Sequence, residues 1–439
     1  MRLLWLTTLL PLLASAAPAT KSSCPAPPKP PYALGAPNTS PPVFSNAGRK
    51  NVVYFSNWAV YSANYTPSDI PVNDVTHLVY GFAEIQTDGS VAPSDPYADL
   101  QAKFTHQASR SVVRRDTNDV NGCIEEMFKL KMANRQLKTM LSVGGGKKSQ
   151  ADLFAAVASD DTKRQKFVDT VISMLGDYGL DGIDLDWEYP EQSQAGDFVT
   201  LLRATREGLD KYAKDNSQDY HYLLTVAAPA GKDHYGKLDI SGMDEYLDSW
   251  NIMAYDFAGG WNSHAGNQAN VFADHRNPNS TPFNTDQAIR DYTGAGVAPE
   301  KLILGMPLYG RSFADTDGMG KTFKGVGPNT DDGIIPYRDL PRAGAKESVN
   351  HYLLAAYSYD TDAKLLVSYD TPDSARLKVS YVNDKKLGGV VFWEASGDKT
   401  GENSLVKTVA QTMHDLDGNQ NMLSYPNSRY DNIRNSGSN

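Results

Sequence analysis

The chain has 439 residues, a formal net charge of −10 and 40% hydrophobic residues. This length and composition are typical of a globular protein with a sizeable core. The negative charge excludes nucleic acid as a partner, because phosphate binding needs clustered Lys and Arg, whereas a neutral or cationic polymer would not be repelled.

The first residues predict export. Arg2 precedes an apolar stretch, residues 3–13, and the small residues 14–16 follow it, which is the pattern of a secretory signal peptide over residues 1–17. The apolar stretch is too short to cross a bilayer, and no later stretch has enough unbroken apolar residues to anchor the chain. We therefore expect a secreted, extracellular protein without a membrane anchor.

Cysteine usage points to a fold stabilised by its core. Cys24 and Cys123 are the only cysteines, so at most one bridge is possible, and whether the two pair is left open. If the chain is exported, three sequons predict a glycoprotein, at Asn38, Asn64 and Asn279, although Pro282 directly after the third argues against its use.

Residues 18–49 are rich in Pro, Ser and Ala and predict a flexible or polyproline-like arm. Eight β-like runs follow it, over residues 51–56, 76–83, 137–144, 180–188, 222–229, 249–255, 302–308 and 389–394. Segments with helical spacing lie between them, for example residues 165–176, 196–213 and 286–295. This alternation predicts an α/β fold, a (β/α)8 TIM barrel formed by residues 50–310 and 385–416.

Two segments fall outside the expected barrel. Residues 311–384 are too long for an ordinary connection and contain strand-like pieces of their own, at 352–359 and 363–369. The polar residues 417–439, in which Asn, Ser and Gly are prominent, predict a disordered tail.

The most informative segment is residues 181–188, which read Asp-Gly-Ile-Asp-Leu-Asp-Trp-Glu. Because side chains alternate along a strand, Asp184, Asp186 and Glu188 share one face, and the apolar residues between them pack on the other. Three carboxylates so close cannot all stay ionised, so at least one holds or shares a proton. A carboxylic acid that stays protonated near neutral pH is what general-acid catalysis requires.

A structural or metal-binding role for this acidic segment is the alternative. Hard cations favour oxygen ligands at irregular spacing on loops, and neither such ligands nor clustered histidines surround this strand. We therefore expect neither a metal nor a cofactor. Asp181 falls on the opposite parity from the other three acids, which predicts a structural role for it.

Three motifs resemble those of the family 18 glycoside hydrolases, the chitinases. The acidic segment, followed by Tyr189 and Pro190, is similar to the family's signature. The other two motifs are the Ser-Val-Gly-Gly segment at residues 142–145 and the Met-Ala-Tyr-Asp segment at residues 253–256. The resemblance extends over about residues 50–415 and is to fungal-type secreted (class V) chitinases. It implies that residues 311–384 form the small α+β insertion found before the last barrel strand.

The resemblance implies hydrolysis of the β-1,4 linkages of chitin, or of chito-oligosaccharides, by a substrate-assisted route that retains configuration through an oxazolinium intermediate. Glu188 is then the general acid and base. Asp186 orients the substrate's acetamido group and exchanges a proton with Asp184. Tyr255 donates a hydrogen bond to the acetamido oxygen, and Asp256 holds the distorted sugar.

The resemblance and strand-end positions also predict residues that bind the substrate. An aromatic side chain at a strand's carboxyl end, such as Trp393, can form a floor under a sugar ring, whereas early-strand aromatics can equally fill the barrel interior. The predicted set is Tyr54, Phe82, Gly144, Gly145, Gly146, Lys147, Tyr189, Met253, Trp261, Tyr309, Arg311 and Trp393. Gly146 is a departure, because the chitinase pattern has Trp there, which puts the aromatic platform beyond the cleaved bond in doubt.

Two other functions compete with the chitinase interpretation. An endo-β-N-acetylglucosaminidase acting on glycoproteins shares the acidic segment, and a chitin-binding lectin on the same scaffold would lack the acid at position 188. Glu188 argues against the lectin, and Tyr255, Trp393 and the insertion favour a chitinase. We expect a monomer.

Overall fold

The computed structural model describes residues 48–104, 118–328 and 330–436. The predicted signal peptide, nearly all of the predicted arm, Cys24 and the sequon at Asn38 lie outside these residues, so the predictions about them stay predictions. Cys123 is buried in helix α3.

Eight parallel strands form a closed barrel, which confirms the predicted (β/α)8 fold. The sheet closes because β1 pairs with β2 on one side and with β14 on the other. The barrel strands are β1 (Lys50–Ser56), β2 (His77–Ile85), β4 (Lys138–Gly144), β5 (Gly182–Asp186), β6 (Leu223–Pro229), β7 (Ser249–Met253), β8 (Leu302–Pro307) and β14 (Gly389–Trp393). A short strand, β3 (Val91–Pro93), adds to β2 in antiparallel orientation. Each of the eight predicted runs overlaps one barrel strand.

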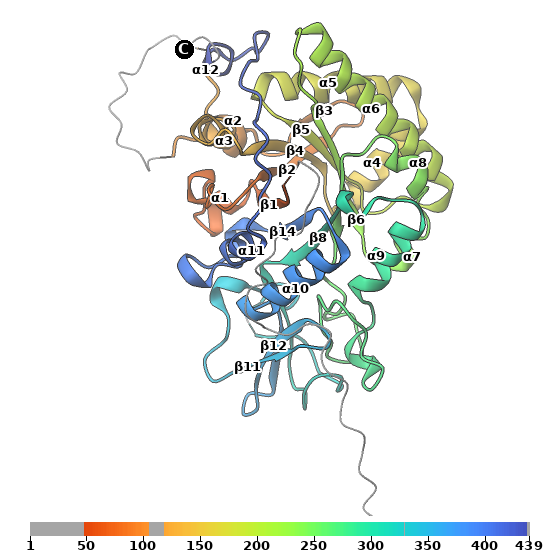
Figure 1. Ribbon diagram of the computed structural model, residues 1–439, viewed down its shortest axis with the longest axis vertical. Coiled ribbons are helices and arrows are strands. Elements are labelled where there is room, and N and C mark those ends of the chain that lie inside the picture. Colours follow the sequence, from red (N-terminus) through yellow and green to blue (C-terminus); the bar gives the residue numbers. More distant parts are fainter. Residues whose placement is uncertain (1–47, 105–117, 329, 437–439) are drawn as a thin grey trace, which may run out of the picture.

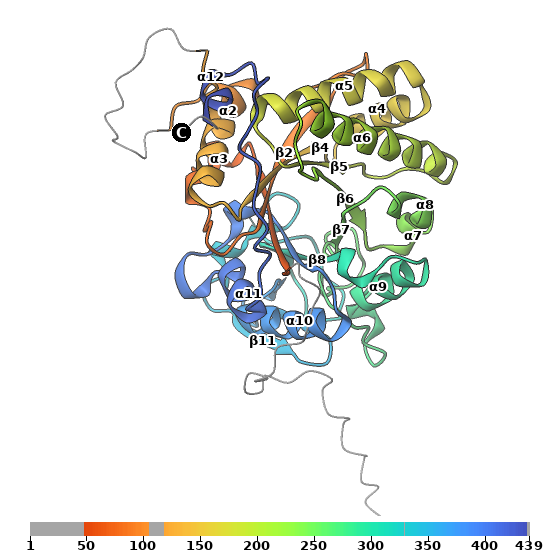
Figure 2. The same cartoon turned by 45° about the horizontal axis from the view of Figure 1, so that its top comes forward.

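Helices surround this barrel on its outside (Figures 1 and 2). The helices are α1 (Ala59–Ser62), α2 (Pro96–Leu100), α3 (Gly122–Ala133), α4 (Lys148–Ser159), α5 (Asp161–Tyr178), α6 (Ala195–Asp215), α7 (Lys232–Tyr235), α8 (Ile240–Asp244), α9 (Thr285–Gly294), α10 (Pro372–Lys385), α11 (Leu405–Met413) and α12 (Asp431–Arg434). The three segments predicted as helical lie in α5, α6 and α9.

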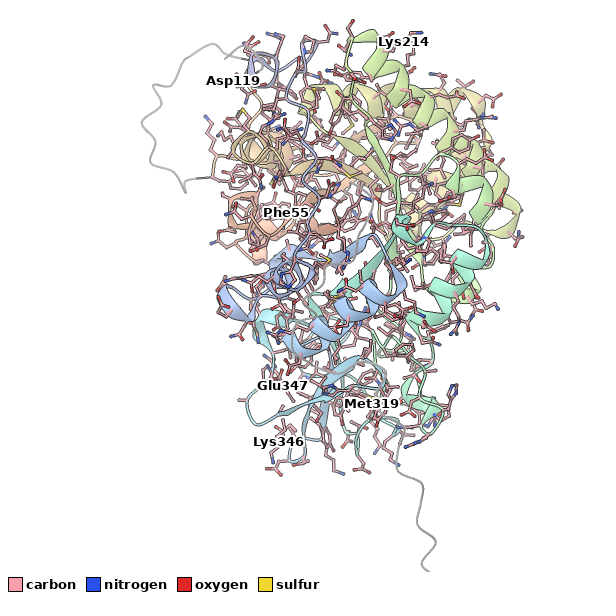
Figure 3. The ribbon with its side chains drawn as sticks, viewed as in Figure 1. Phe55, Asp119, Lys214, Met319, Lys346 and Glu347 are labelled. Atoms are coloured by element: carbon pink, nitrogen blue, oxygen red, sulfur yellow. The ribbon has the colours of Figure 1, made fainter. Side chains whose placement is uncertain are left out.

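Strand alternation divides the core into two layers. Tyr54 on β1 points into the barrel, where it belongs to a small apolar cluster with Val79, Met140 and Val391. Its neighbour Phe55 is fully buried on the outer side, in the large core between strands and helices. Figure 3 shows Phe55 amid the fold, whereas Lys214 and Lys346 lie at its periphery. The inner positions of the barrel are therefore available for a site at the strand ends.

The entry into β5 follows from local sequence. Asp160 caps α5 by accepting a hydrogen bond from the backbone N–H of Lys163. The helix ends at Gly179, whose φ of 67° is left-handed and suits glycine. The chain then turns directly into β5, which places the acidic segment in the middle of the barrel wall.

A second sheet of five antiparallel strands lies between β8 and β14 in the chain. It comprises β9 (Tyr309–Phe313), β10 (Ile334–Pro336), β11 (Lys346–Asn350), β12 (Ala355–Asp360) and β13 (Leu365–Ser368). In Figure 1, β11 and β12 lie below the barrel. The range expected for the insertion, 311–384, also takes in most of α10, but α10 packs against α11 and β14 of the barrel.

The expectation of a disordered tail from residue 417 is wrong for residues 417–436. This segment crosses the amino-terminal end of the barrel, and α12 lies beside α2 (Figures 1 and 2). Asn421 donates hydrogen bonds to the carbonyl oxygens of Lys131, Asn134 and Leu137, and Tyr425 is fully buried. The polar composition of the segment predicted disorder, but its few large side chains are buried against the barrel and its amide groups form hydrogen bonds there.

Asp181 directly precedes β5 at this amino-terminal end. Its carboxylate lies 2.7 Å from the ammonium of Lys131, and both side chains are fully buried. It also accepts a hydrogen bond from the backbone N–H of Met422 in the C-terminal segment, at 2.8 Å. Asp181 therefore fastens the C-terminal segment to the barrel, in line with the structural role that its parity predicted.

Among the residues that the structure describes, no helix combines the length and the apolarity needed to span a membrane.

The packing of the C-terminal segment generates a stability prediction. Tyr425→Ala should lower the free energy of unfolding by about 3–5 kcal/mol, because it removes a fully buried aromatic ring. It also removes the hydroxyl that donates to the carbonyl of Leu180 and accepts from Lys131. Denaturant unfolding checks this, with Tyr97→Ala, at a side chain that is 59% exposed, as the control. Equal stability of the two variants would contradict the assigned packing.

Candidate active site

The carboxyl ends of the barrel strands surround a cavity of about 500 Å³. The acidic strand β5 supplies its centre. Asp186 and Glu188 line the cavity, and Asp184 is fully buried beneath it. The alternate side chains point outward, as predicted: Ile183 and Leu185 are fully buried, and the Trp187 ring lies 5.4 Å from Phe154 in a stacked arrangement. This outward packing anchors the chain on both sides of Asp186 and directly before Glu188.

Asp184 is held by four donors. Its Oδ2 accepts hydrogen bonds from Tyr54 Oη at 2.8 Å and from Ser142 Oγ at 2.7 Å. Its Oδ1 accepts from Thr225 Oγ1 at 2.6 Å and from Asn251 Nδ2 at 3.3 Å. Burial raises the pKa of Asp184, and these hydrogen bonds oppose the rise by stabilising its charged form. Ser142, the first residue of the Ser-Val-Gly-Gly segment, is thus a hydrogen-bond partner of Asp184.

Asp186 lies above Asp184 and has a different environment. Its side chain is buried, and its Oδ1 has no hydrogen-bond partner among the described residues. Desolvation raises the pKa of Asp186 well above its ordinary value, and the charges of Glu188 and Asp184 raise it further. An unpartnered buried carboxylate oxygen is costly unless a proton or a ligand satisfies it.

Glu188 follows the end of β5 and faces the same cavity. Desolvation raises the pKa of Glu188, a hydrogen bond with Tyr189 opposes the rise, and the negative charge of Asp256 adds to it. Asp186 and Glu188 therefore titrate as a pair that retains a proton at a higher pH than isolated carboxyl groups. A protonated carboxyl at the barrel mouth can donate to an oxygen of a bound molecule, and the neighbouring carboxylate can stabilise positive charge.

The end of β7 and the residues after it add three more predicted residues. Met253, Tyr255 and Asp256 all line the cavity. Desolvation, followed by the charges of Asp186 and Glu188, raises the pKa of Tyr255 well above its usual value. Its hydroxyl therefore keeps its proton and can act as a donor toward the cavity.

Three of the predicted binding residues lie behind Asp256 and are not among those that line the cavity. Arg311 on β9 donates from its Nε to the Asp256 carboxylate at 2.8 Å. The Arg311 guanidinium lies 4.9 Å from the ring centre of Trp261 and 5.6 Å from that of Tyr309. The second sheet thus fixes Asp256 through Arg311. Trp261 is 55% exposed, so it lies at the outer edge of this group.

Aromatic rings form one side of the cavity. The ring of Trp393 lies 5.7 Å from that of Phe82 and 5.6 Å from that of Tyr54. Trp58, which sequence reasoning missed, lies 6.3 Å from Trp393 and 6.1 Å from Phe82, and is 47% exposed. Its position two residues beyond β1 is a signal in the sequence, because Trp393 likewise lies at the carboxyl end of a barrel strand.

The glycines after β4 allow the chain to approach the acids closely. A Cβ atom at Gly144, where φ is 110°, would lie 2.3 Å from the backbone oxygen of Asp186. A Cβ atom at Gly146 would lie 3.2 Å from Glu188 Oε1. Lys147, which follows, lines the cavity and lies 2.6 Å from Glu84, a carboxylate that sequence reasoning missed.

Sequence reasoning identified most of the cavity's centre and little of its rim. Of the predicted residues, the structure brings together at the cavity Tyr54, Phe82, Gly144, Gly145, Gly146, Lys147, Asp186, Glu188, Tyr189, Met253, Tyr255, Asp256 and Trp393. The lining residues that were missed are Asn57, Trp58, Glu84, Ser94, Asp95, Ala227, Asn251 and Val391. Apart from Trp58, none had a motif or a conspicuous position in the sequence.

Known proteins resemble the chain over most of its length. A model of the glycosyl hydrolases family 18 matches residues 50–398. Chitinase 1 of Aphanocladium album is 43% identical over 390 residues, which are 88% of this chain and 91% of that protein. Endochitinase 1 of Metarhizium robertsii is 43% identical over 389 residues, 88% of this chain and 90% of that protein. The family resemblance that the motifs carry is thereby confirmed.

Solved structures agree with the sequence relatives. The catalytic domain of the psychrophilic chitinase B from Arthrobacter superposes with a TM-score of 0.75 at 26% identity, over 84% of this chain and 98% of that one. A family 18 chitinase from Cycas revoluta, solved in complex with (GlcNAc)3, gives a TM-score of 0.68 at 28% identity, over 82% of this chain and 98% of that one.

The electrostatics of the site generate a titration prediction. Asp256→Asn should lower the pKa of Glu188, because it removes a negative charge that favours the protonated form and leaves Arg311 without this partner. Carboxyl-carbon NMR of labelled glutamate measures the change. Asp332→Asn is the matched control, since Asp332 also pairs with Arg311 but its side chain is 64% exposed. A Glu188 pKa that moves equally in both variants, or rises in Asp256→Asn, would contradict the assigned charge interaction.

Proposed function

The chain belongs to family 18 of the glycosyl hydrolases and is a chitinase, and we propose that Glu188 supplies the proton that breaks the glycosidic bond of its substrate. Its substrate is chitin, a polymer of β-1,4-linked N-acetylglucosamine. The observation that supports this role best is the position of Glu188 at the cavity, beside a buried Asp186 whose Oδ1 is left unpartnered by the described part of the chain. Together, Glu188 and Asp186 supply one proton for the glycosidic oxygen and one negative charge that stabilises a cationic intermediate.

The first step breaks the bond between two sugars. The carboxyl proton of Glu188 moves to the glycosidic oxygen, and the leaving sugar departs with that oxygen as a hydroxyl. The carbonyl oxygen of the substrate's own acetamido group attacks the anomeric carbon and forms a cyclic oxazolinium ion. The positive charge of this ion is shared with the acetamido nitrogen, so a nearby carboxylate stabilises it.

In this proposal, Asp186 and Tyr255 form hydrogen bonds to the two ends of the substrate's acetamido group. The unpartnered Oδ1 of Asp186 accepts the acetamido N–H, which satisfies the buried oxygen and orients the carbonyl for attack. Tyr255 donates its hydroxyl hydrogen to the acetamido oxygen. Asp184, with its four donors, takes the negative charge when Asp186 holds the shared proton.

The second step restores the enzyme. A water molecule gives its proton to the carboxylate of Glu188 and attacks the anomeric carbon, so the oxazolinium ring opens and the acetamide re-forms. Two inversions at the same carbon give net retention of configuration. Asp256, held by Arg311 at 2.8 Å, keeps the pKa of Glu188 raised for the next proton transfer and contacts the distorted sugar.

The cavity walls bind the sugar units on either side of the cleaved bond. The Trp393 ring forms the floor under the reacting sugar, and Tyr54, Phe82, Tyr189 and Met253 enclose it. The three glycines at 144–146 and Lys147 border the acid, where the small size of the glycines leaves room for the substrate. Arg311, packed against the rings of Tyr309 and Trp261, acts through Asp256. Trp261 lies at the outer edge of the cleft.

We also propose that the protein is secreted and acts as a monomer. The apolar start of the sequence favours export, and a polymeric substrate outside the cell requires it. Two of the three sequons lie in the described residues, and both asparagines, Asn64 and Asn279, are exposed. Neither the endo-β-N-acetylglucosaminidase nor the lectin alternative gains support from the two fungal relatives, which are named as a chitinase and an endochitinase.

The proton transfer is tested by Glu188→Gln. The amide keeps the shape of the side chain and cannot deliver a proton, so kcat on chito-oligosaccharides should fall at least about a hundredfold while binding persists. Glu191→Gln is the matched control, because Glu191 is an exposed surface glutamate paired with Lys237. Substantial hydrolysis by pure Glu188→Gln protein would refute the assigned role.

The shared proton predicts a bell-shaped dependence of kcat/KM on pH. The rate falls as pH rises through the raised pKa of Glu188, because the acid is lost. It also falls as pH drops through the pKa values of Asp184 and Asp186, because the negative charge is lost. Burial raises all three pKa values, so both limbs should lie above the ordinary carboxyl range near about 4. A profile that stays flat through the acidic and neutral range would contradict the arrangement.

A further inference from the structure

A polar wall beside Trp58 has no part in the mechanism above. It is formed by Asn57, directly after β1, and by Ser94, directly after β3, and both residues line the cavity. Asp99 on α2 lies behind them and is 3% exposed. We call these three residues the Asn57 wall.

The hydrogen bonds of the Asn57 wall leave one acceptor and one donor unused. The side-chain nitrogen of Asn57 donates both its hydrogens, to Ser94 Oγ at 2.8 Å and to Asp99 Oδ1 at 3.0 Å. The amide oxygen of Asn57 has no partner among the described residues. Ser94 accepts from Asn57, so its own hydroxyl hydrogen remains available.

Asp99 fixes which way the Asn57 amide points. An ionised carboxylate can only accept, so the nitrogen of Asn57 must face Asp99 and its oxygen must face away. Asp99 also accepts from the hydroxyl of Tyr80 and from the backbone N–H of Asp95 at 3.3 Å. Together these donors hold the carboxylate, and through it the amide, in one orientation.

Within the described ranges, the titratable groups that act on Asp99 are uncharged or acidic. Tyr80 and Asp95 shift the pKa of Asp99 directly. Cys123 on α3 interacts with both Tyr80 and Asp99. Desolvation raises the pKa of Asp99 to about 6, although the hydrogen bonds from Tyr80 and Asn57 oppose the rise. Glu126 on α3 acts on Cys123 and is likewise acidic. Near neutral pH the carboxylate is thus ionised and is satisfied by hydrogen bonds.

We propose that Asn57 and Ser94 bind a sugar unit of the chitin chain that packs against Trp58, outside the reaction centre, and that Asp99 is their positioning residue. The oxygen of Asn57 accepts the acetamido N–H of that unit, and the hydroxyl of Ser94 donates to the adjacent 3-hydroxyl oxygen. This assignment rests on the proposed function.

The chemistry of N-acetylglucosamine fits this wall. Its acetamido N–H and its 3-hydroxyl oxygen sit on neighbouring ring carbons, so they offer a donor and an acceptor side by side. Asn57 and Ser94, joined by their own 2.8 Å hydrogen bond, present the complementary acceptor and donor. Trp58, 47% exposed and 6.3 Å from Trp393, offers an apolar ring face next to them. A chain that leaves the reaction centre along Trp393 and Trp58 therefore meets the Asn57 wall.

Binding measurements in a Glu188→Gln background separate this inference from the proposed catalysis. Isothermal titration with N-acetylglucosamine oligomers of increasing length should show Asn57→Ala and Ser94→Ala each weakening the long oligomers roughly five- to thirtyfold, the loss expected for one or two hydrogen bonds. The shortest oligomers that still bind should be unaffected. Ser90→Ala is the control, because Ser90 lies directly before β3 and Ser94 directly after it, and the Ser90 side chain bonds to Asp88, away from the cavity lining.

The role of Asp99 has its own readout. Asp99→Asn offers the Asn57 amide both a donor and an acceptor, so the amide can turn and long oligomers should bind more weakly. In an Asn57→Ala background the same change should have no further effect, whereas a purely structural role would give additive losses. In the enzyme with Glu188 intact, KM for long oligomers should rise while kcat holds.

The outcomes distinguish the two proposals. If Glu188→Gln protein binds no oligomer of any length, the proposed function fails and this inference fails with it. If it binds long oligomers, and Asn57→Ala and Ser94→Ala bind them as tightly as Ser90→Ala does, only the inference is overturned. Ser94 is half-buried, so Ser94→Ala keeps the test open even if loss of the Asn57 amide destabilises the fold.

Discussion

The crowding of Asp184, Asp186 and Glu188 in a desolvated cavity is the constraint on which the rest of the structure depends. In water three neighbouring carboxylates would all ionise, and their repulsion would be weak. Inside the barrel, burial penalises each charge and the groups penalise one another, so a proton stays with the Asp186 and Glu188 pair. The chemistry proposed for the chain needs that retained proton and the remaining charge together.

The two ends of β5 have different roles: the residues at its amino end stabilise the fold, and those at its carboxyl end face the cavity. At the amino end, Asp181 forms a buried ion pair with Lys131 and holds the C-terminal segment through Met422. At the carboxyl end, one oxygen of Asp186 has no hydrogen-bond partner within the described ranges. The ion pair of Asp181 with Lys131 satisfies a buried charge within the protein. The Oδ1 oxygen of Asp186 can instead accept a hydrogen bond from a substrate. Trp187, which directly follows Asp186, fixes the carboxyl end through its ring contact with Phe154.

Residues far apart in the sequence complete the site. Arg311 reaches Asp256 from the second sheet, so an element outside the barrel helps set the charge near Glu188. On another side, Asp99 of α2 orients Asn57 at the end of β1. In both cases a buried partner acts on a cavity residue through one hydrogen bond. The cleft is therefore organised by pairs in which one residue lines the cavity and a buried partner holds that residue's side chain in place.

The sequence by itself determined the eight strands, the shared face of the three acids and the family, because alternation along a strand and fixed motif spacing are local properties of the chain. Only the tertiary structure decided the rim. Asn57, Glu84 and Ser94 have no local pattern, and they reach the cavity because β1, β2 and β3 end beside one another. Composition likewise failed for the C-terminal segment, since burial of Tyr425 depends on the surface it meets. Which distant segments converge is a property of the closed barrel, and a linear pattern does not record it.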